Sequence, residues 1–352
     1  MKSILLKLAV TVVIFLFFCI CPRPESYDTC IGASDRAAIH EDPTFSGTVG
    51  DSRNSRGNCW SEVELKDKIS DKIIVASPPD SRNVPPQRTR PTLINSPLPS
   101  QMTGSIRSVE LPDGKRLLAL TFDLCEVEKE ISGYDFEIAN YLRANNIKAT
   151  FFACGKWMRS HPEKTMQLMS DPLFEIGNHG WNHKNFRLLD NKKIQDQILW
   201  TQAEYELLWE QLRQNPCFRQ NGGNEVPRVP RLFRFPFGTC NSQSLCMLQE
   251  LGLPAIQWSI VSGDPAKGQS AKGIAEIVLK KAQPGSIIVC HANGRGHGTA
   301  GSLPIFIPKL RDRGFEFVTV SELLAAGTPV ACPQCYETKP GDNRRYDRPS
   351  KR

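Results

Sequence analysis

Two histidines four residues apart, His179 and His183, have the residue type and spacing that point most directly to chemistry in this sequence. Imidazoles at this spacing can face one point, on a helical turn or in a tight loop, which suits a divalent metal ion. The alternative is a pair of unrelated loop histidines. Four of the six histidines in the chain fall in such loops, which favours a common site.

Other polar side chains stand where short apolar segments end. Their positions follow segments that we predict to be strands: Asp123, the His179 and His183 pair, Arg234, Asp264 and His291. The carboxyl ends of parallel strands in a barrel converge on one pocket, so these residues would become neighbours. Beside a metal, Asp123 could take a proton from water and His291 could return one to a leaving group. Considered alone, Asp123 could equally cap a turn.

The elements that would position these residues alternate along the chain. We predict strands over 118–126, 148–154, 174–179, 231–237, 255–261, 286–291 and 315–320. Helical patterns cover 133–145, 161–170, 190–212, 242–251, 271–282, 304–313 and 321–326. A glycine-rich nucleotide loop is absent from the sequence, which favours a barrel over a doubly wound sheet. We therefore predict an α/β fold, a distorted (β/α) barrel of about seven parallel strands, as a single catalytic domain with a disordered N-terminal arm.

The segments on either side of this domain, which we place at 105–328, differ in composition. Residues 4–20 are apolar and follow Lys2, so 1–21 reads as a signal peptide or an N-terminal membrane anchor, and both alternatives stay open. Residues 22–104 are rich in Pro, Ser, Asp, Arg and Asn, which predicts a low-complexity linker. Residues 329–352 read as a loosely ordered basic tail. We expect an exported protein that is periplasmic, secreted or anchored in the inner membrane, with membrane attachment through its N-terminal segment in the anchored case.

Cysteine content and charge narrow the class of protein further. The chain of 352 residues has 12 cysteines, and an exported chain of this kind is expected to form disulfides. Cys332 and Cys335 could form half of a zinc site, but a second Cys-x-x-Cys is missing, which favours disulfides or free thiols there. A net charge of +7 is modest for this length, and its basic residues are scattered or lie in the tails. We therefore expect no nucleic-acid partner.

Taken together, the motifs resemble those of the polysaccharide deacetylases of carbohydrate esterase family 4, the nodulation-type chitooligosaccharide deacetylase homology domain. The resemblance covers about residues 115–325 and keeps five motif regions in the family's order. Thr121-Phe122-Asp123 resembles the first motif, whose first aspartate is the general base. His179-x-x-x-His183 resembles the second, which supplies two metal ligands.

The three later motifs of the resemblance supply the remaining roles. Arg234-Phe-Pro-Phe-Gly238 resembles the third, in which the arginine orients the base and the N–H of Phe237 would help to hold the oxyanion. The segment 258–264 resembles the fourth, although its usual Asp-Trp pair is not kept, and its Asp264 would tune the acid. The segment 288–291 resembles the fifth, which ends in the general acid, His291.

The resemblance implies a hydrolase that removes N-acetyl groups from amino-sugar polymers, such as chitooligosaccharides, peptidoglycan or another exported glycan. It also implies a divalent metal, with zinc as the expected ion. Two other functions compete with this one. The first is a metal-free hydrolase of small or cyclic amides on the same fold, and the second is a carbohydrate-binding pseudoenzyme.

One departure from the family pattern affects the predicted set of metal ligands. Leu124 stands where the family has a second aspartate as third ligand, and leucine cannot coordinate a metal. Glu126, Cys125 and Asp123 are candidate replacements; otherwise the metal is held weakly or not at all. Glu126 is our first choice because a hard oxygen ligand suits divalent ions, and we expect Cys125 to be a buried thiol or half of a disulfide.

Three further side chains are candidates for substrate binding. Phe237 and Trp181 could stack on sugar rings, with packing at the rim as the alternative. His297 lies in a glycine-rich loop just after His291, where it could line the sugar cleft or simply face solvent.

Overall fold

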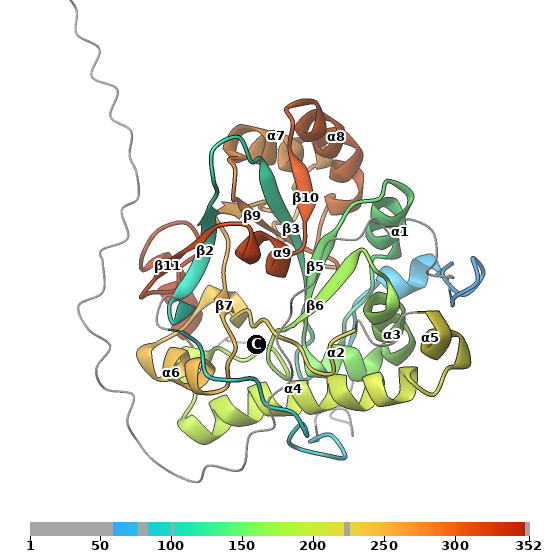
Figure 1. The fold of residues 1–352 in the computed structure, drawn as a ribbon, viewed down its shortest axis with the longest axis vertical. Coiled ribbons are helices and arrows are strands. Elements are labelled where there is room, and N and C mark those ends of the chain that lie inside the picture. The colour runs from blue at the N-terminus through green and yellow to red at the C-terminus, as the bar shows by residue number, and fades with distance from the viewer. Residues whose placement is uncertain (1–58, 77–83, 100–101, 222–225, 349–352) are drawn as a thin grey trace, which may run out of the picture.

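The computed structural model describes residues 59–76, 84–99, 102–221 and 226–348 (Figure 1). The predicted signal peptide or anchor at 1–21 lies outside these residues. Within the described part of the chain, every helix is too short or too polar to cross a membrane.

The strand β3 (Leu117–Leu124) lies at the centre of the main sheet. Its partners follow the order β6-β5-β3-β9-β8, with β10 also paired to β3. These strands are β5 (Ala149–Ala153), β6 (Phe174–Asn178), β8 (Ile260–Val261), β9 (Ile287–His291) and β10 (Glu316–Val318). All of their pairings are parallel, which confirms the α/β prediction.

A second, smaller sheet closes the structure into a distorted barrel. It has the order β11-β2-β7, formed by β2 (Ser105–Glu110), β7 (Ala255–Ile256) and β11 (Thr328–Cys332). Single-residue bridges join the two sheets: Phe233 pairs with Asn178 and Ala255, and Ser108 pairs with Ser286. The predicted strand at 231–237 is therefore only a bridge at Phe233. Prolines at positions 230 and 236 have no N–H to donate, which prevents a regular strand here.

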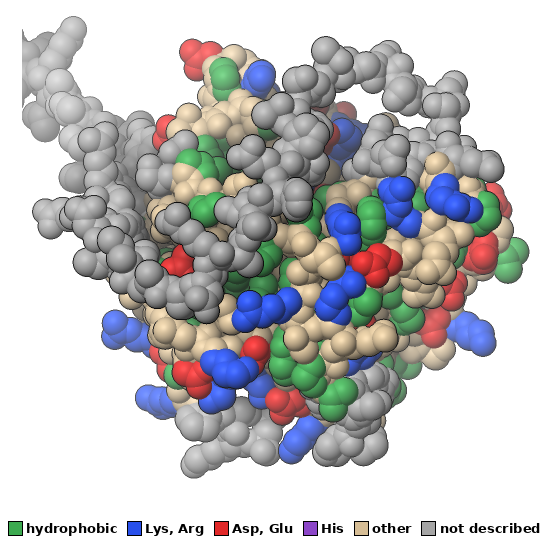
Figure 2. Space-filling model, turned by 60° about the horizontal axis from the view of Figure 1, so that its bottom comes forward, with side chains coloured by type: hydrophobic (Ala, Val, Ile, Leu, Met, Phe, Trp, Pro, Cys, Tyr) green, Lys and Arg blue, Asp and Glu red, His purple; other side chains and the backbone are tan. Residues whose placement is uncertain are grey.

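Helices cover the outside of the barrel. In the order of the chain they are α1 (Phe136–Ala144), α2 (Gly155–Ser160), α3 (Pro162–Ser170), α4 (Asn191–Leu212), α5 (Pro216–Asn221), α6 (Ser242–Glu250), α7 (Ala271–Lys281), α8 (Thr299–Asp312) and α9 (Val320–Ala325). In Figure 1, α7 and α8 lie at one end of the molecule and α4 runs across the other. The face in Figure 2 mixes basic and acidic side chains, in keeping with surface ion pairs such as Lys192 with Asp196 on α4.

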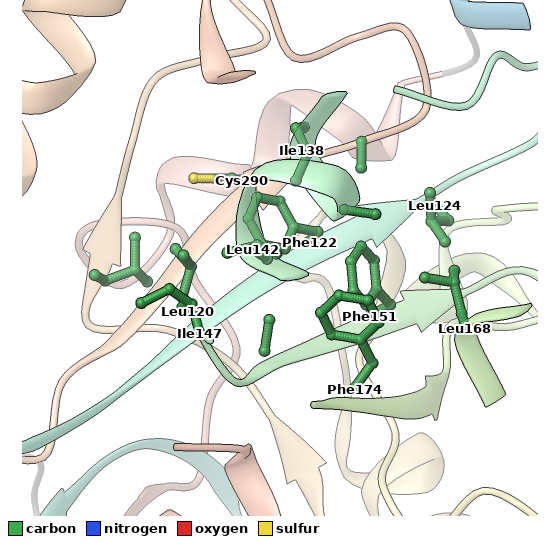
Figure 3. Close-up of a cluster of buried hydrophobic side chains, with 14 of the residues drawn as sticks. Leu120, Phe122, Leu124, Ile138, Leu142, Ile147, Phe151, Leu168, Phe174 and Cys290 are labelled. Atoms are coloured by element: carbon green, nitrogen blue, oxygen red, sulfur yellow. The ribbon is translucent and has the colours of Figure 1, made fainter. Parts of the chain in front are cut away.

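Alternate residues of β3 serve different purposes. Leu118, Leu120, Phe122 and Leu124 belong to the large buried apolar cluster, shown in part in Figure 3. Because side chains of a strand alternate between its faces, residues 119, 121 and 123 point to the opposite side, toward the barrel interior. The polar residues Thr121 and Asp123 are thereby brought to the site and away from the cluster of the leucines.

Part of the predicted linker packs onto the barrel, contrary to our expectation for 22–104. Cys59 forms a disulfide with Cys217, and the strand β1 (Val75–Ala76) pairs with β4 (Glu130–Ile131). Arg88 forms an ion pair with Glu206 at 2.7 Å. Polar and covalent contacts thus attach this segment, and its composition, which is poor in apolar residues, does not reveal them.

The C-terminal segment 328–348, here called the C-terminal strap, is likewise ordered, which corrects the prediction of a loose tail. Cys335 forms a disulfide with Cys240, and Cys332 is also disulfide-bonded. The prediction of disulfides or free thiols over zinc is confirmed, with disulfides as the form found. Asn343 is fully buried and donates to the carbonyl oxygens of Gly238 and Cys335. The strap is therefore fixed beside the turn that carries Phe237.

Candidate functional site

Asp123 lies at the end of β3 and is held by a buried arginine. Nη1 of Arg234 donates to Oδ1 of Asp123 at 2.8 Å and to Oγ1 of Thr121 at 2.8 Å. Burial opposes the ionisation of Asp123, but the positive charge of Arg234 beside it keeps the pKa of this carboxyl below its usual value. The carboxylate is therefore ionised and fixed in orientation.

His291 lies on the neighbouring strand, in register with Asp123. Its Nδ1 is 2.9 Å from Oδ1 of Asp264, and its backbone N–H donates to Oδ2 of the same carboxylate at 2.7 Å. Asp264 also accepts hydrogen bonds from Ser262 and Thr299. Burial alone would lower the pKa of His291, but the carboxylate of Asp264 raises it above the usual value. An imidazolium that can donate a proton is the result.

A third group brings His179, His183 and Cys125 together. Their potential ligand atoms all lie within 4.8 Å of one another. Nδ1 of His179 is 2.8 Å from the carbonyl oxygen of Arg234, and its Nε2 is buried without a hydrogen-bond partner. Burial lowers the pKa of both His179 and His183, which favours neutral imidazoles.

These residues fit the divalent metal that the resemblance implies. An orphaned, buried Nε2 on a histidine whose Nδ1 faces a carbonyl oxygen is the arrangement expected of a metal ligand. The backbone of His183 has φ 55°, in the left-handed region, so its ring position is set by an uncommon turn. Imidazole nitrogens and a cysteine sulfur are also ligand types that zinc binds in proteins.

Glu126, the third ligand that we expected, is not part of this group. It is fully buried, and its carboxylate accepts hydrogen bonds from the N–H of Ser132 at 2.9 Å and the hydroxyl of Ser160 at 2.6 Å. Nζ of Lys156 lies 3.3 Å away. These partners hold Glu126 as a structural carboxylate that shapes the loop after β3. Burial raises its pKa.

The predicted substrate-binding residues occupy different environments. Phe237 is half-buried, with φ 58°, and its ring lies 4.4 Å from that of His183 and 5.0 Å from that of Tyr346 on the strap. Trp181 is fully buried and packs edge-on against Trp200, so it cannot stack on a sugar in this structure.

His297 is exposed in the loop before α8, where its backbone N–H donates to the carbonyl oxygen of Asp264 at 2.8 Å. Tyr346 had no signal in the sequence, because its segment read as a loose tail. Of the predicted aromatic residues, Phe237 thus lies at the site. Tyr346, which was not predicted, packs against its ring.

Comparison with known proteins agrees with this geometry. Residues 110–256 match the family model described as polysaccharide deacetylase. Residues 110–256 are thus similar to polysaccharide deacetylase domains. The matched segment includes Asp123, His179, His183 and Arg234. Asp264 and His291 follow the matched segment, so their place in the site comes from the geometry alone.

Among curated proteins, the chain is similar to the peptidoglycan-N-acetylglucosamine deacetylase PgdA of Listeria monocytogenes. The two are 30% identical over 224 residues, which make up 63% of this chain and 42% of the Listeria protein. The chain therefore spans less than half the length of that relative.

Solved structures share the fold. The Bc1960 peptidoglycan N-acetylglucosamine deacetylase is 27% identical, with a TM-score of 0.51 over 63% of this chain and 93% of that chain. The wild-type BA3943 protein of Bacillus anthracis, a CE4 family pseudoenzyme, has a TM-score of 0.50 at 23% identity over 60% of this chain and 66% of that chain. At that identity the second likeness shows the fold alone.

Proposed function

We propose that this protein hydrolyses N-acetyl groups of an amino-sugar polymer, with Asp123 as general base and His291 as general acid. The observation that carries the proposal is the register of β3 and β9, which sets a charged Asp123 beside His291. Oδ2 of Asp123 also lies 3.7 Å from Nε2 of His179, one of the two histidines suited to a metal. An acid, a base and a metal group on one pocket meet the needs of amide hydrolysis.

Asp123 would accept the proton of the attacking water. Its two oxygens have separate tasks, since Oδ1 is held by Arg234 and Oδ2 faces Nε2 of His179 at 3.7 Å. Fixing the carboxylate in this way lowers the entropy lost on reaching the transition state. The backbone N–H of Phe237 is the proposed donor to the oxyanion that forms.

His291 would then deliver a proton to the amine nitrogen of the sugar, because an amide anion is too poor a leaving group. The carboxylate of Asp264 accepts the hydrogen on Nδ1, which leaves Nε2 to face the substrate. Retention of this charged pair is difficult to explain in a protein that only binds sugar.

His179 and His183 are the proposed metal ligands, and zinc is the proposed ion. When bound, a divalent metal would polarise the acetamide carbonyl and its water. Burial keeps the two imidazoles neutral, so they need not lose a proton before they bind it.

The proposed substrate is an N-acetylated glycan outside the cytoplasm, as for the peptidoglycan deacetylases that the chain resembles. Disulfides among the described residues, such as Cys59 with Cys217 and Cys240 with Cys335, support an oxidising compartment. The paired rings of Phe237 and Tyr346 offer an apolar wall for the sugar. Attachment to a membrane through residues 4–20 stays a prediction.

Acetate release tests the function directly. The full chain, loaded with zinc, would be incubated with N-acetylglucosamine oligomers and with peptidoglycan, beside the Asp123→Asn variant. Asp113→Asn is a matched control, because Asp113 is exposed in the turn before β3, at the end of the strand opposite the site. We expect acetate from the wild type and the control, and a loss of at least about 100-fold in Asp123→Asn, as is typical for a general base.

Two other results would contradict this proposal, and each would support one of the two competing functions. Glycan binding with no acetate release from any polymer would make the protein a pseudoenzyme. Turnover of small or cyclic amides but not of glycans, unaffected by chelators, would identify the metal-free amide hydrolase.

A further inference from the structure

We propose that Cys125 is the third protein ligand of the metal centre, bound through its sulfur as a thiolate. The inference deepens the proposed function and rests on it for its catalytic meaning. It assigns the ligand that Leu124 cannot supply, and it replaces Glu126 in that role.

The alternation of β3 explains why this residue reaches the site. Leu124 belongs to the buried apolar cluster, together with Leu120 and Phe122 of the same strand (Figure 3). The two-residue period puts Cys125 on the same side as Asp123, so the residue just past the strand end turns back toward the barrel interior. The strand alternation thus places residue 125 on the side of the metal site, whereas the side chain of residue 124 packs in the apolar core and cannot reach a metal.

The contacts of Glu126, our first choice from the sequence, favour Cys125 as the ligand instead. The carboxylate of Glu126 is already bound by Ser132, Ser160 and Lys156. Cys125 forms no disulfide and is buried. Its sulfur lies within 4.8 Å of the ligand atoms of both histidines.

His179 provides the independent sign that something binds here. It is 1% exposed, and its Nε2 has no hydrogen-bond partner, which is costly for a buried polar atom. Its Nδ1 faces the carbonyl oxygen of Arg234, so the tautomer with a proton on Nδ1 leaves the Nε2 lone pair for a metal. The unpartnered nitrogen belongs to the same group as the sulfur.

A thiolate changes which ions the site would select. Sulfur is a soft ligand that favours zinc and cobalt and disfavours magnesium, calcium and manganese, which prefer oxygen. Two imidazoles and one thiolate also leave the fourth tetrahedral position open, as catalytic zinc sites do. The expected order of binding is therefore zinc and cobalt far above magnesium or manganese.

Cobalt and zinc provide the test on the full-length protein. Cobalt bound to the wild type should show a thiolate-to-metal charge-transfer band in the near ultraviolet. X-ray absorption of the zinc form should show one sulfur at about 2.3 Å beside nitrogen ligands. Cys125→Ser should lose the band and weaken zinc binding by more than about 100-fold, since even outer-shell partners cost 10- to 100-fold.

Two controls make the test specific. Cys290 is a second buried free cysteine, which belongs to the apolar cluster, so Cys290→Ala should keep the band. Glu126→Gln should also keep it. The zinc absorption measurement needs no variant, so misfolding of Cys125→Ser would not leave the proposal untested.

The outcomes separate this inference from the proposed function when acetate release is measured on the same samples. Zinc bound by nitrogen and oxygen alone, a band retained in Cys125→Ser, or a wild type that binds neither metal would overturn the assignment of Cys125. Acetate release without sulfur ligation would leave the deacetylase proposal standing. Sulfur ligation without acetate release from any glycan would support the ligand and contradict the function.

Discussion

Removing the charge of Arg234 should destabilise the protein in a way that depends on Asp123. Arg234 is fully buried and Asp123 is nearly so, at 4% exposure. Besides its bond to the carboxylate, the guanidinium donates to the carbonyl oxygens of Ile256 and Gln257 at 3.2 and 3.3 Å. The Arg234→Met variant keeps an unbranched apolar stem while it leaves a buried carboxylate without its partner.

The size of the effect follows from these contacts. Breaking a buried ion pair by removing one partner costs roughly 3–5 kcal/mol in the free energy of unfolding. When Asp123 has already been replaced by asparagine, the same change removes no charge pair and loses mainly the hydrogen bonds to carbonyl oxygens, about 1–2 kcal/mol. The double-mutant cycle should therefore give a coupling of about 1–4 kcal/mol.

The sign of the pH dependence gives a second test. In the wild type the pKa of Asp123 is lowered, so its contribution to stability is present above the unfolded pKa and is lost as the pH falls through the folded one. Without Arg234, burial raises the pKa of Asp123 above the unfolded value. The folded variant then binds more protons than the unfolded chain, so the cost of Arg234→Met should shrink as the pH falls from about 7.5 toward about 5.

Urea unfolding, followed by tryptophan fluorescence at both pH values with disulfides intact, measures these free energies for all four proteins of the cycle. An equal cost of Arg234→Met in the wild type and in the Asp123→Asn background, or a cost that grows at low pH, would refute the charge-pair explanation.

Three further predictions concern the acid, the strap and its disulfide. Asp264→Asn should move the alkaline limb of kcat to lower pH, because the charge that raises the pKa of His291 is lost; a pH–rate profile with an unmoved limb would contradict this. Tyr346→Ala should raise KM for chitooligosaccharides about 2- to 10-fold with little change in kcat, as expected for loss of an aromatic contact, whereas Tyr346→Phe should retain the wild-type value. Replacing Cys240 and Cys335 together by serine should lower the free energy of unfolding by about 4–5 kcal/mol, since the bridge joins residues 95 apart in sequence. A measured loss below about 1 kcal/mol would mean that the strap stays ordered in the unfolded chain or is held by other contacts.

The sequence was sufficient to place the charged residues at strand ends. Asp123 and His291 end apolar segments of strand length, and parallel strands leave little freedom in where those ends meet. The segment 231–237 resembles a strand in sequence because its apolar residues are nearly contiguous. Pro230, just before the segment, and Pro236, near its end, were the available signal against that prediction.

The choice between Cys125 and Glu126 depends on the register of one strand. Applying the two-residue alternation from Asp123 onward would have put Cys125 on the inner face. The ion pair of Glu126 with Lys156 and its hydrogen bond from Ser160 could not be predicted, because both partners lie about thirty residues away in sequence.

The described parts of the two flanking segments, 59–76 with 84–99 and 329–348, pack onto the barrel, contrary to prediction, and the physical reason is shared. Composition measures how much apolar surface a segment can bury, and both segments have little. Their attachment depends instead on disulfides to distant cysteines, such as Cys59 with Cys217, and sequence alone does not specify the pairing.

The position of the C-terminal strap has a practical consequence for fragments of this protein. A fragment cut to the family match at 110–256 would lack His291, the proposed general acid, and Asp264. One that ends after α9 would lack β11 and the partner of Cys240. The edge of β2 would then be exposed as an unpaired strand, which invites aggregation. Expression should therefore extend at least to residue 348, and affinity tags belong beyond it.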